Sequence, residues 1–151
     1  MFLRLKNEHQ ADADRVGLKQ FLDGQGLRVC HDGYFGTLVD AEDRGLAFDG
    51  SFSDLHLDPL DQPDPVSGGI LHATLSLDEC RFIFALCLAG QLLVVNPQED
   101  PIFVVVAHNH HVEDLPDDCV TAWADNAEEL ASALDGSFRR FLDYRNHMLG
   151  L

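Results

Sequence analysis

The feature that most constrains the fold is a long, nearly continuous apolar segment in the middle of the chain. It opens with Ser76-Leu77-Asp78-Glu79, a capping box in which a hydroxyl residue precedes a glutamate by three positions. Residues from Cys80 to Leu88 are apolar around nearly the whole circumference of a helix, which indicates burial on all sides. We therefore predict a buried central helix over 76–89, with Gly90 as its left-handed C-cap.

Two apolar strands are predicted directly after this helix. The runs Gln91–Asn96 and Ile102–His108 are almost continuously apolar, which is typical of strands covered on both faces of a sheet. Residues 96–101 include two prolines and several polar turn formers, so the two strands are expected to form a hairpin.

The rest of the chain predicts elements on both sides of this block. Prolines and paired glycines make 53–69 a surface loop. Helices are expected over 8–23, 125–134 and 137–149, with an Arg139–Asp143 ion pair in the last, and strands over 27–30, 36–39, 46–48 and 70–75. The sum is a single α+β domain, residues 1–151, whose mostly antiparallel sheet is packed with N-terminal, central and C-terminal helices.

Negative charge is concentrated in one stretch. Between Gly45 and Phe138 there are 17 Asp and Glu residues and one base, Arg81, which makes a net charge of −16, equal to that of the whole chain. Such a field favours a cationic protein as partner and repels nucleic acid and anionic membranes. An alternative is adaptation to high salt, since Asp outnumbers Glu 19 to 7 and lysine occurs only at Lys6 and Lys19.

The sequence also bears on where the protein works. The first residues lack the apolar region of a secretory signal, and the longest apolar runs are too short to cross a bilayer. The four cysteines are irregularly spaced, without a C-x-x-C pair. We expect a cytoplasmic protein with reduced thiols.

A histidine cluster is the one candidate metal site. It comprises His108, His110 and His111, and an extended backbone would place His108 and His110 on the same face, where they could bind Zn or Ni. Glu113 or Asp114 could add an oxygen ligand. The alternative is a polar strand end without a metal. No other catalytic motif is present, and the sequence favours a binding protein over an enzyme.

Two acidic segments and a tryptophan form the candidate partner-binding set. Prolines would hold the carboxylates of the first segment in extended positions, which suits a binding loop, and the alternative is a solvated connector. Trp123 beside carboxylates resembles an interface anchor for Arg or Lys, and its alternative role is core packing. The set is Asp54, Asp58, Asp61 and Asp64 in the first segment, Glu113, Asp114, Asp117 and Asp118 in the second, and Trp123.

Part of the chain, about residues 90–145, resembles the SUKH-type bacterial immunity superfamily. The resemblance rests on the strands Leu92–Asn96 and Ile102–Ala107, a following loop, and the closing segment Ser137-Phe138-Arg139-Arg140-Phe141-Leu142. It implies an immunity protein that neutralises a cationic bacterial toxin or effector by steric and electrostatic occlusion. Two alternatives stay open: a metal-binding module or metal-dependent enzyme at the histidine cluster, and a regulatory domain that binds a basic protein segment.

Overall fold

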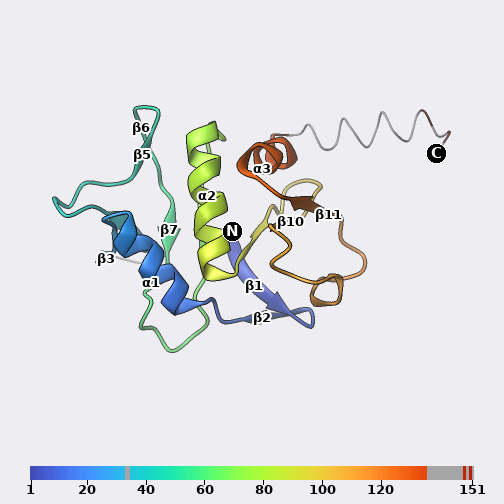
Figure 1. Ribbon diagram of the computed structural model, residues 1–151, viewed down its shortest axis with the longest axis horizontal. Helices are drawn as coiled ribbons and strands as arrows, with labels where there is room; N and C mark the ends of the chain where they lie inside the picture. The colour runs from blue at the N-terminus through green and yellow to red at the C-terminus, as the bar shows by residue number, and fades with distance from the viewer. Residues whose placement is uncertain (33–34, 136–147, 149, 151) are drawn as a thin grey trace.

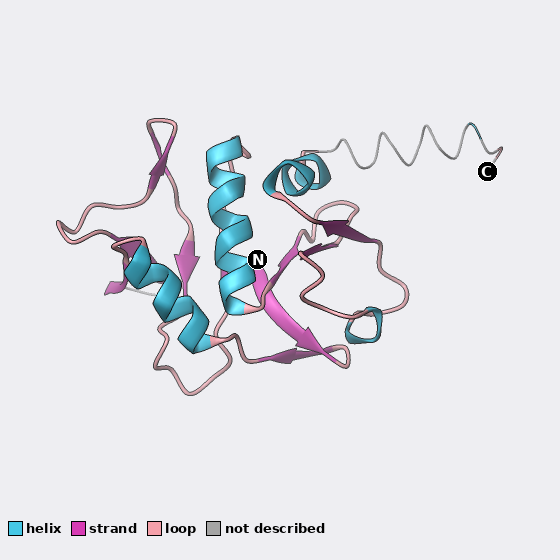
Figure 2. Cartoon of the chain, in the orientation of Figure 1, coloured by secondary structure: helices cyan, strands magenta, loops and turns pink. Residues whose placement is uncertain are grey.

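A nine-stranded, mostly antiparallel sheet with three helices forms the protein, in a computed structural model that describes residues 1–32, 35–135, 148 and 150 (Figures 1 and 2). The predicted α+β arrangement is confirmed. The helices are α1 (Arg15–Gly24), α2 (Leu77–Gly90), α3 (Ala127–Leu134) and a short 3₁₀ turn, η1 (Val112–Asp114). The strands are β1 (Phe2–Lys6), β2 (His9–Ala11), β3 (Arg28–Asp32), β4 (Phe35–Val39), β5 (Ala47–Phe48), β6 (Ser51–Phe52), β7 (His56–Leu57), β8 (Gly68–Gly69), β9 (Leu93–Val95), β10 (Phe103–Val106) and β11 (Thr121–Ala124).

The sheet runs in the order β11-β10-β9-β1-β8-β7-β4-β3, with β2 paired to β1 and a separate β5–β6 hairpin. Only β10 and β11 pair in parallel among the described strands, and β9–β10 is the predicted hairpin. The strand order therefore ends at β11 on one side of the sheet and at β3 on the other.

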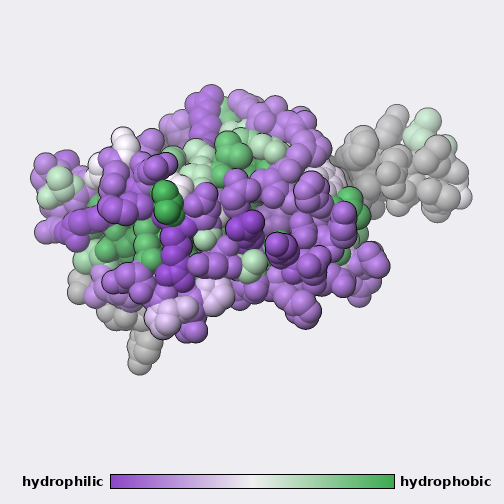
Figure 3. All heavy atoms as spheres, turned by 60° about the horizontal axis from the view of Figure 1, so that its bottom comes forward, coloured by the Kyte–Doolittle hydropathy of each residue, from purple (hydrophilic) through white to green (hydrophobic). Residues whose placement is uncertain are grey.

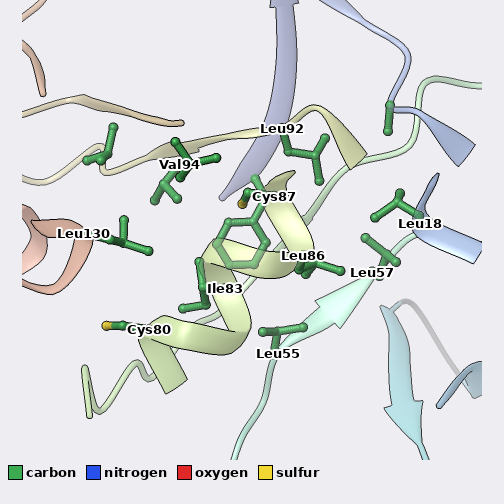
Figure 4. Packing of buried hydrophobic residues seen from close by; sticks show 14 of the residues in the cluster. Leu18, Leu55, Leu57, Cys80, Ile83, Leu86, Cys87, Leu92, Val94 and Leu130 are labelled. Carbon is green, nitrogen blue, oxygen red and sulfur yellow. The ribbon is translucent and has the colours of Figure 1, made fainter. Parts of the chain in front are cut away.

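The main core lies between the sheet and the helices, with α2 between α1 and α3 (Figure 1). Figure 4 shows α2 side chains meeting side chains of the neighbouring strands and helices around Ile83, Leu86 and Cys87. Val104 and Val106 of β10 belong to this core, whereas the alternate residues Phe103 and Val105 belong to a second, smaller core. Both faces of β10 are thus covered, as its continuous apolar run predicts.

The central helix is confirmed, but it is not buried on all sides, because Leu77 and Leu88 are exposed, and its end differs from the prediction. Ser76 accepts a hydrogen bond from the backbone N–H of Glu79, as in a capping box. The residue in the left-handed conformation at the other end is Gln91 (φ 56°) rather than Gly90. Gly90 is required for packing instead, because a Cβ at this position would lie 2.7 Å from Cδ2 of Leu18.

The predicted helix over 8–23 is wrong in its first half. Residues 2–11 form the β1–β2 hairpin, whose turn residues Asn7 and Glu8 have φ values of 50° and 67°. Two successive positive φ angles match the twist of a tight hairpin. The helix begins only at Arg15, where Asp14 caps the backbone N–H of Gly17 at 2.9 Å.

Four further features differ from the prediction. The segment 70–75 is not a strand, because Glu79 turns back and accepts hydrogen bonds from the N–H groups of Thr74 and Leu75. The segment 53–69, predicted as a loop, contributes the strands β7 and β8 to the sheet. The strand β11 was not predicted. Asn126, one residue later than expected, caps α3. The helix expected over 137–149 lies outside the described residues except for Met148, and so does the Arg139–Asp143 pair.

Candidate functional site

Trp123 lies on β11, at the outer edge of the sheet. In the described part of the chain, this strand has a neighbour on one side only, β10. Ala122 and Ala124 are buried in the helix-covered core, so the side chain between them lies on the opposite face of the sheet. Trp123 is 36% exposed, which favours the anchor role over core packing.

His108 lies against this tryptophan. The two rings are stacked, with centroids 5.7 Å apart and an interplanar angle of 21°. On its other side, Nε2 of His108 is 3.1 Å from Oδ1 of Asp125, which follows β11. His108 therefore supports Trp123 and ties it to a carboxylate at the end of the edge strand.

His110 has a different and buried position. Its Nε2 accepts a hydrogen bond from the backbone N–H of Leu5 in β1 at 3.2 Å. Nδ1 therefore carries the ring proton, which it donates to Oδ1 of Asn109 at 2.7 Å. The amide of Asn109 donates in turn to the carbonyl oxygen of Leu92 at 2.8 Å. This chain of bonds joins β1 to the segment between α2 and β9, so both ring nitrogens already have a structural partner.

The geometry predicted for the metal site is wrong. β10 ends at Val106, and Ala107 and His108 have φ values of 47° and 52°, so the backbone is not extended through the cluster. The described residues contain no group of three or more His, Cys, Asp or Glu that could hold a metal ion together. His111 is exposed, and its backbone N–H donates to Oδ2 of Asp114 at 3.0 Å. Binding of Zn or Ni here stays a prediction.

The buried position of His110 makes stability depend on pH. Burial lowers its pKa below the value of 6.5 for an ordinary histidine, and the nearby Asp114 offsets only part of this effect. The stabilisation is complete above about pH 6.5 and is lost as the pH falls through the folded-state pKa, because protonated Nε2 cannot accept from Leu5.

We expect His110→Ala to lower the free energy of unfolding by about 1–3 kcal/mol at pH 8. The difference between the wild type and this variant should shrink steadily as the pH falls below 6.5. Urea unfolding at a series of pH values measures both quantities. His9→Ala, on the exposed strand β2, is the matched control. A difference that stays constant with pH would contradict the assigned role.

The acidic loop is only half available to a partner. Asp54 accepts from the backbone N–H groups of Leu71 and His72, and its Oδ2 is 2.6 Å from Nδ1 of His72. Burial alone would raise the pKa of Asp54, but these bonds outweigh it and lower the pKa. Asp58 accepts from the N–H and the hydroxyl of Ser67. Both carboxylates hold the loop in place.

The other two carboxylates of this loop, Asp61 and Asp64, are exposed. Neither side chain forms a hydrogen bond or ion pair with the described residues. Arg15 binds the backbone here instead, since its guanidinium donates to the carbonyl oxygens of Leu60, Gln62 and Asp64. Arg15 of α1 thus holds the loop together with Asp54 and Asp58.

The second acidic segment divides in the same way. Asp114 accepts from the backbone N–H groups of His111 and Asn7, and these bonds lower its pKa. Glu113, Asp117 and Asp118 are exposed. Asp114 therefore joins its segment to the β1–β2 turn by a hydrogen bond. The other three carboxylates are exposed to solvent.

The exposed acids before β11 lie close to a further carboxylate. Sγ of Cys119 is 3.7 Å from Oδ1 of Asp118, and Asp100 lies two residues before Ile102, whose N–H donates to the carbonyl oxygen of Val120 at 3.0 Å. Burial, followed by Asp118 and Asp100, raises the pKa of the Cys119 thiol. No Lys or Arg of the described chain pairs with Asp117 or Asp118. The edge strand consequently has unneutralised acids at its start and Asp125 at its end. Asp100 could not be predicted as part of this group from the sequence, because only the β9–β10 hairpin brings it close to the start of β11.

The two acidic segments do not form one surface. β7, beside the acidic loop, and β11 are five strand spacings apart in the sheet order, or roughly 24 Å. They lie on opposite sides of the molecule in Figure 1. Figure 3 shows that the surface of the face it presents is largely hydrophilic, with apolar areas between the polar side chains. Only the β11 side combines free carboxylates with an exposed tryptophan.

A groove of about 780 Å³ is lined by residues of the central strands of the sheet and of the turn after β9. Its floor is formed by β9, β1, β8 and β7, and His56 and His72 are among its polar lining residues. An Asp–His pair such as Asp54–His72 can serve as a general base. Because His72 is 88% exposed, this pair lies at the open rim of the groove.

The two cysteines of the central helix are unsuited to a reactive role. Cys80 and Cys87 are free thiols and are buried as predicted. Burial raises the pKa of Cys80 to about 11 and that of Cys87 to about 12, so neither forms a thiolate readily. Among the described helices, none has the length and apolar composition needed to cross a bilayer.

Comparison with protein-family models, curated proteins and solved structures finds no match for this chain. The resemblance to the SUKH superfamily therefore stays a prediction.

Proposed function

We propose that this protein binds a cationic protein through the β11 edge, and that the partner is a toxin or effector that it neutralises by steric and electrostatic occlusion. We define the β11 edge as Thr121–Ala124 with the flanking acids Asp117, Asp118 and Asp125. The observation that carries the proposal is the exposed Trp123 on an edge strand preceded by two carboxylates, Asp117 and Asp118, that have no Lys or Arg partner in the described chain.

Electrostatics explains how such a surface would act. The field of a chain with net charge −16 accelerates encounter with a cationic protein, and salt screens this effect. The bound state then depends on a few close contacts, of which an aromatic side chain at the centre is a typical anchor. Occlusion follows because a bound acidic domain covers the cationic surface that a toxin would use on its target.

Affinity capture with charge-matched baits tests the proposal. The tagged wild type, the double variant Asp117→Asn/Asp118→Asn and the control Asp61→Asn/Asp64→Asn are each exposed to the lysate of the source cells at low salt. The two variants lose the same charge, but only the first changes the β11 edge. We expect one basic protein on the wild type and the control, eluted by salt and depleted from the first variant.

The function of the captured protein completes the test. Expressed alone, it should arrest growth, and co-expression of the wild type should restore growth. The proposal is wrong if no basic protein is enriched, or if both double variants lose it equally. The latter result would show that net charge, rather than this edge, drives the interaction. Growth that the captured protein does not affect would leave a binding role and exclude toxin neutralisation.

A further inference from the structure

We infer that the outer edge of β11 accepts an extended, lysine- or arginine-bearing segment of the partner as an additional strand of the sheet. This inference rests on the proposed function and specifies its binding mode. It requires free backbone groups on the edge, a reason for a cationic occupant, and an anchor for its side chains.

The backbone groups are identified by the hydrogen bonds to β10. The carbonyl oxygen of Val120 accepts from Ile102 and Phe103 at 3.0 and 3.3 Å, and that of Ala124 accepts from Ala107 at 2.8 Å. In a parallel pair, alternate residues of a strand bond to the same neighbour. The backbone N–H and C=O groups of the even-numbered residues of β11 therefore point toward β10.

Thr121 and Trp123 consequently direct their N–H and C=O groups away from the sheet. Neither residue makes a hydrogen bond outside the β10–β11 ladder within the described chain. They present two donors and two acceptors in a row, which is the arrangement that an incoming strand pairs with.

Charge decides which segment can use this edge. Asp117 and Asp118 precede the strand, Asp125 follows it, and Asp100 lies two residues before Ile102, which bonds to Val120 at the start of the strand. If two copies of this chain paired through β11, these carboxylates would approach each other, and like charges across paired strands are destabilising. A segment with alternating Lys or Arg instead meets opposite charge at both ends.

Trp123 supplies the anchor. Its ring remains 36% exposed although His108 is stacked against it. A cation within about 6 Å of an indole ring is attracted to its face. Because the added strand would lie directly beside Trp123, a Lys or Arg on the same face of the sheet would reach the exposed part of the ring.

A synthetic peptide is the probe. It is blocked at both ends, has seven residues that alternate lysine and valine, and is compared with a peptide in which glutamate replaces each lysine. Amide hydrogen exchange by NMR follows the N–H groups of Thr121 and Trp123. We expect the lysine peptide to slow exchange of both amides by at least tenfold, and the glutamate peptide to have no effect.

Substitution at Thr121 separates strand addition from attraction by charge. Thr121→Pro removes one outward donor without removing a bond to β10, since proline is tolerated on edge strands where the N–H faces solvent. Thr121→Val keeps the N–H and the side-chain shape. We expect Thr121→Pro to weaken peptide binding about tenfold, equivalent to 1.4 kcal/mol, and Thr121→Val to bind like the wild type. Unchanged exchange protection of β10 shows that the proline variant is folded.

Two results would overturn the inference. One is peptide binding that leaves the amides of Thr121 and Trp123 unprotected, and the other is no binding of the lysine peptide at low salt. If Thr121→Pro does not fold, the exchange result on the wild type decides alone. A protein partner captured through Asp117 and Asp118 would still support the proposed function after either failure, so the two proposals can fail separately.

Discussion

Trp123→Ala should weaken binding of the captured cationic partner by about 30-fold or more, equivalent to at least about 2 kcal/mol. The indole is the one aromatic side chain on the β11 edge, and alanine would remove both its buried contact area and its attraction for a cation. The loss should appear mainly as faster dissociation, because the carboxylates that steer encounter are unchanged. Calorimetry and surface plasmon resonance with the purified partner measure affinity and rates.

Phe52→Ala is the matched control for this variant. Phe52 is an aromatic residue on β6 that is 84% exposed, more so than Trp123, and it lies at the far side of the molecule (Figure 1). Its replacement should leave affinity unchanged. His108→Ala should give an intermediate loss, because Trp123 would keep its position in the strand but lose the stacked imidazole. Equal losses for Trp123 and Phe52 would exclude a specific anchor at the edge.

Gly17→Ala should lower the free energy of unfolding by about 3 kcal/mol, the upper end of the usual effect of overpacking. Gly17 lies in the first turns of α1, where a Cβ atom would overlap the backbone carbonyl oxygen of Ala89 and lie 3.0 Å from Oδ2 of Asp14. A backbone atom cannot move aside as a flexible side chain can. The N–H of Asp14 also donates to the carbonyl oxygen of Gly90 at 2.8 Å, so moving α1 away from α2 would stretch this bond.

Gly24→Ala, at the other end of the same helix, controls for the change in residue type. Beyond the adjoining backbone of the helix, a Cβ atom at this position would have no atom within 4 Å. Alanine should therefore be neutral or should stabilise the protein by up to about 0.5 kcal/mol, because it restricts the unfolded chain. Urea denaturation of both variants provides the comparison. A Gly17→Ala protein as stable as the wild type would show that the two helices can separate at little cost.

Local patterns were sufficient for elements whose stabilising contacts come from nearby residues. Ser76 and Glu79 mark the start of α2 because a capping box is closed within one helical turn. The apolar runs of β9 and β10 predict buried strands because both faces of these strands are covered. By contrast, β7, β8 and β11 are two to four residues long and too short for a periodic signal, so only their neighbours in the sheet define them.

The histidine cluster shows why its role could not be predicted. An H-x-H pair lies on one face only if the backbone is extended, and the positive φ values of Ala107 and His108 depend on how the chain leaves β10. The partner of His110 is the N–H of Leu5, 105 residues away in the sequence. No local pattern contains that contact.

The order of the residues alone shows that the protein is strongly acidic, that its charge is concentrated in one stretch, and that it has enough apolar residues for a packed domain. Tertiary contacts decided which acids can meet a partner. Asp54, Asp58 and Asp114 are bound by donors from other segments, whereas Asp61, Asp117 and Asp118 face solvent. The physical reason is that a carboxylate becomes structural when the fold brings unpaired N–H groups to it, and those groups come from residues that the sequence does not place nearby.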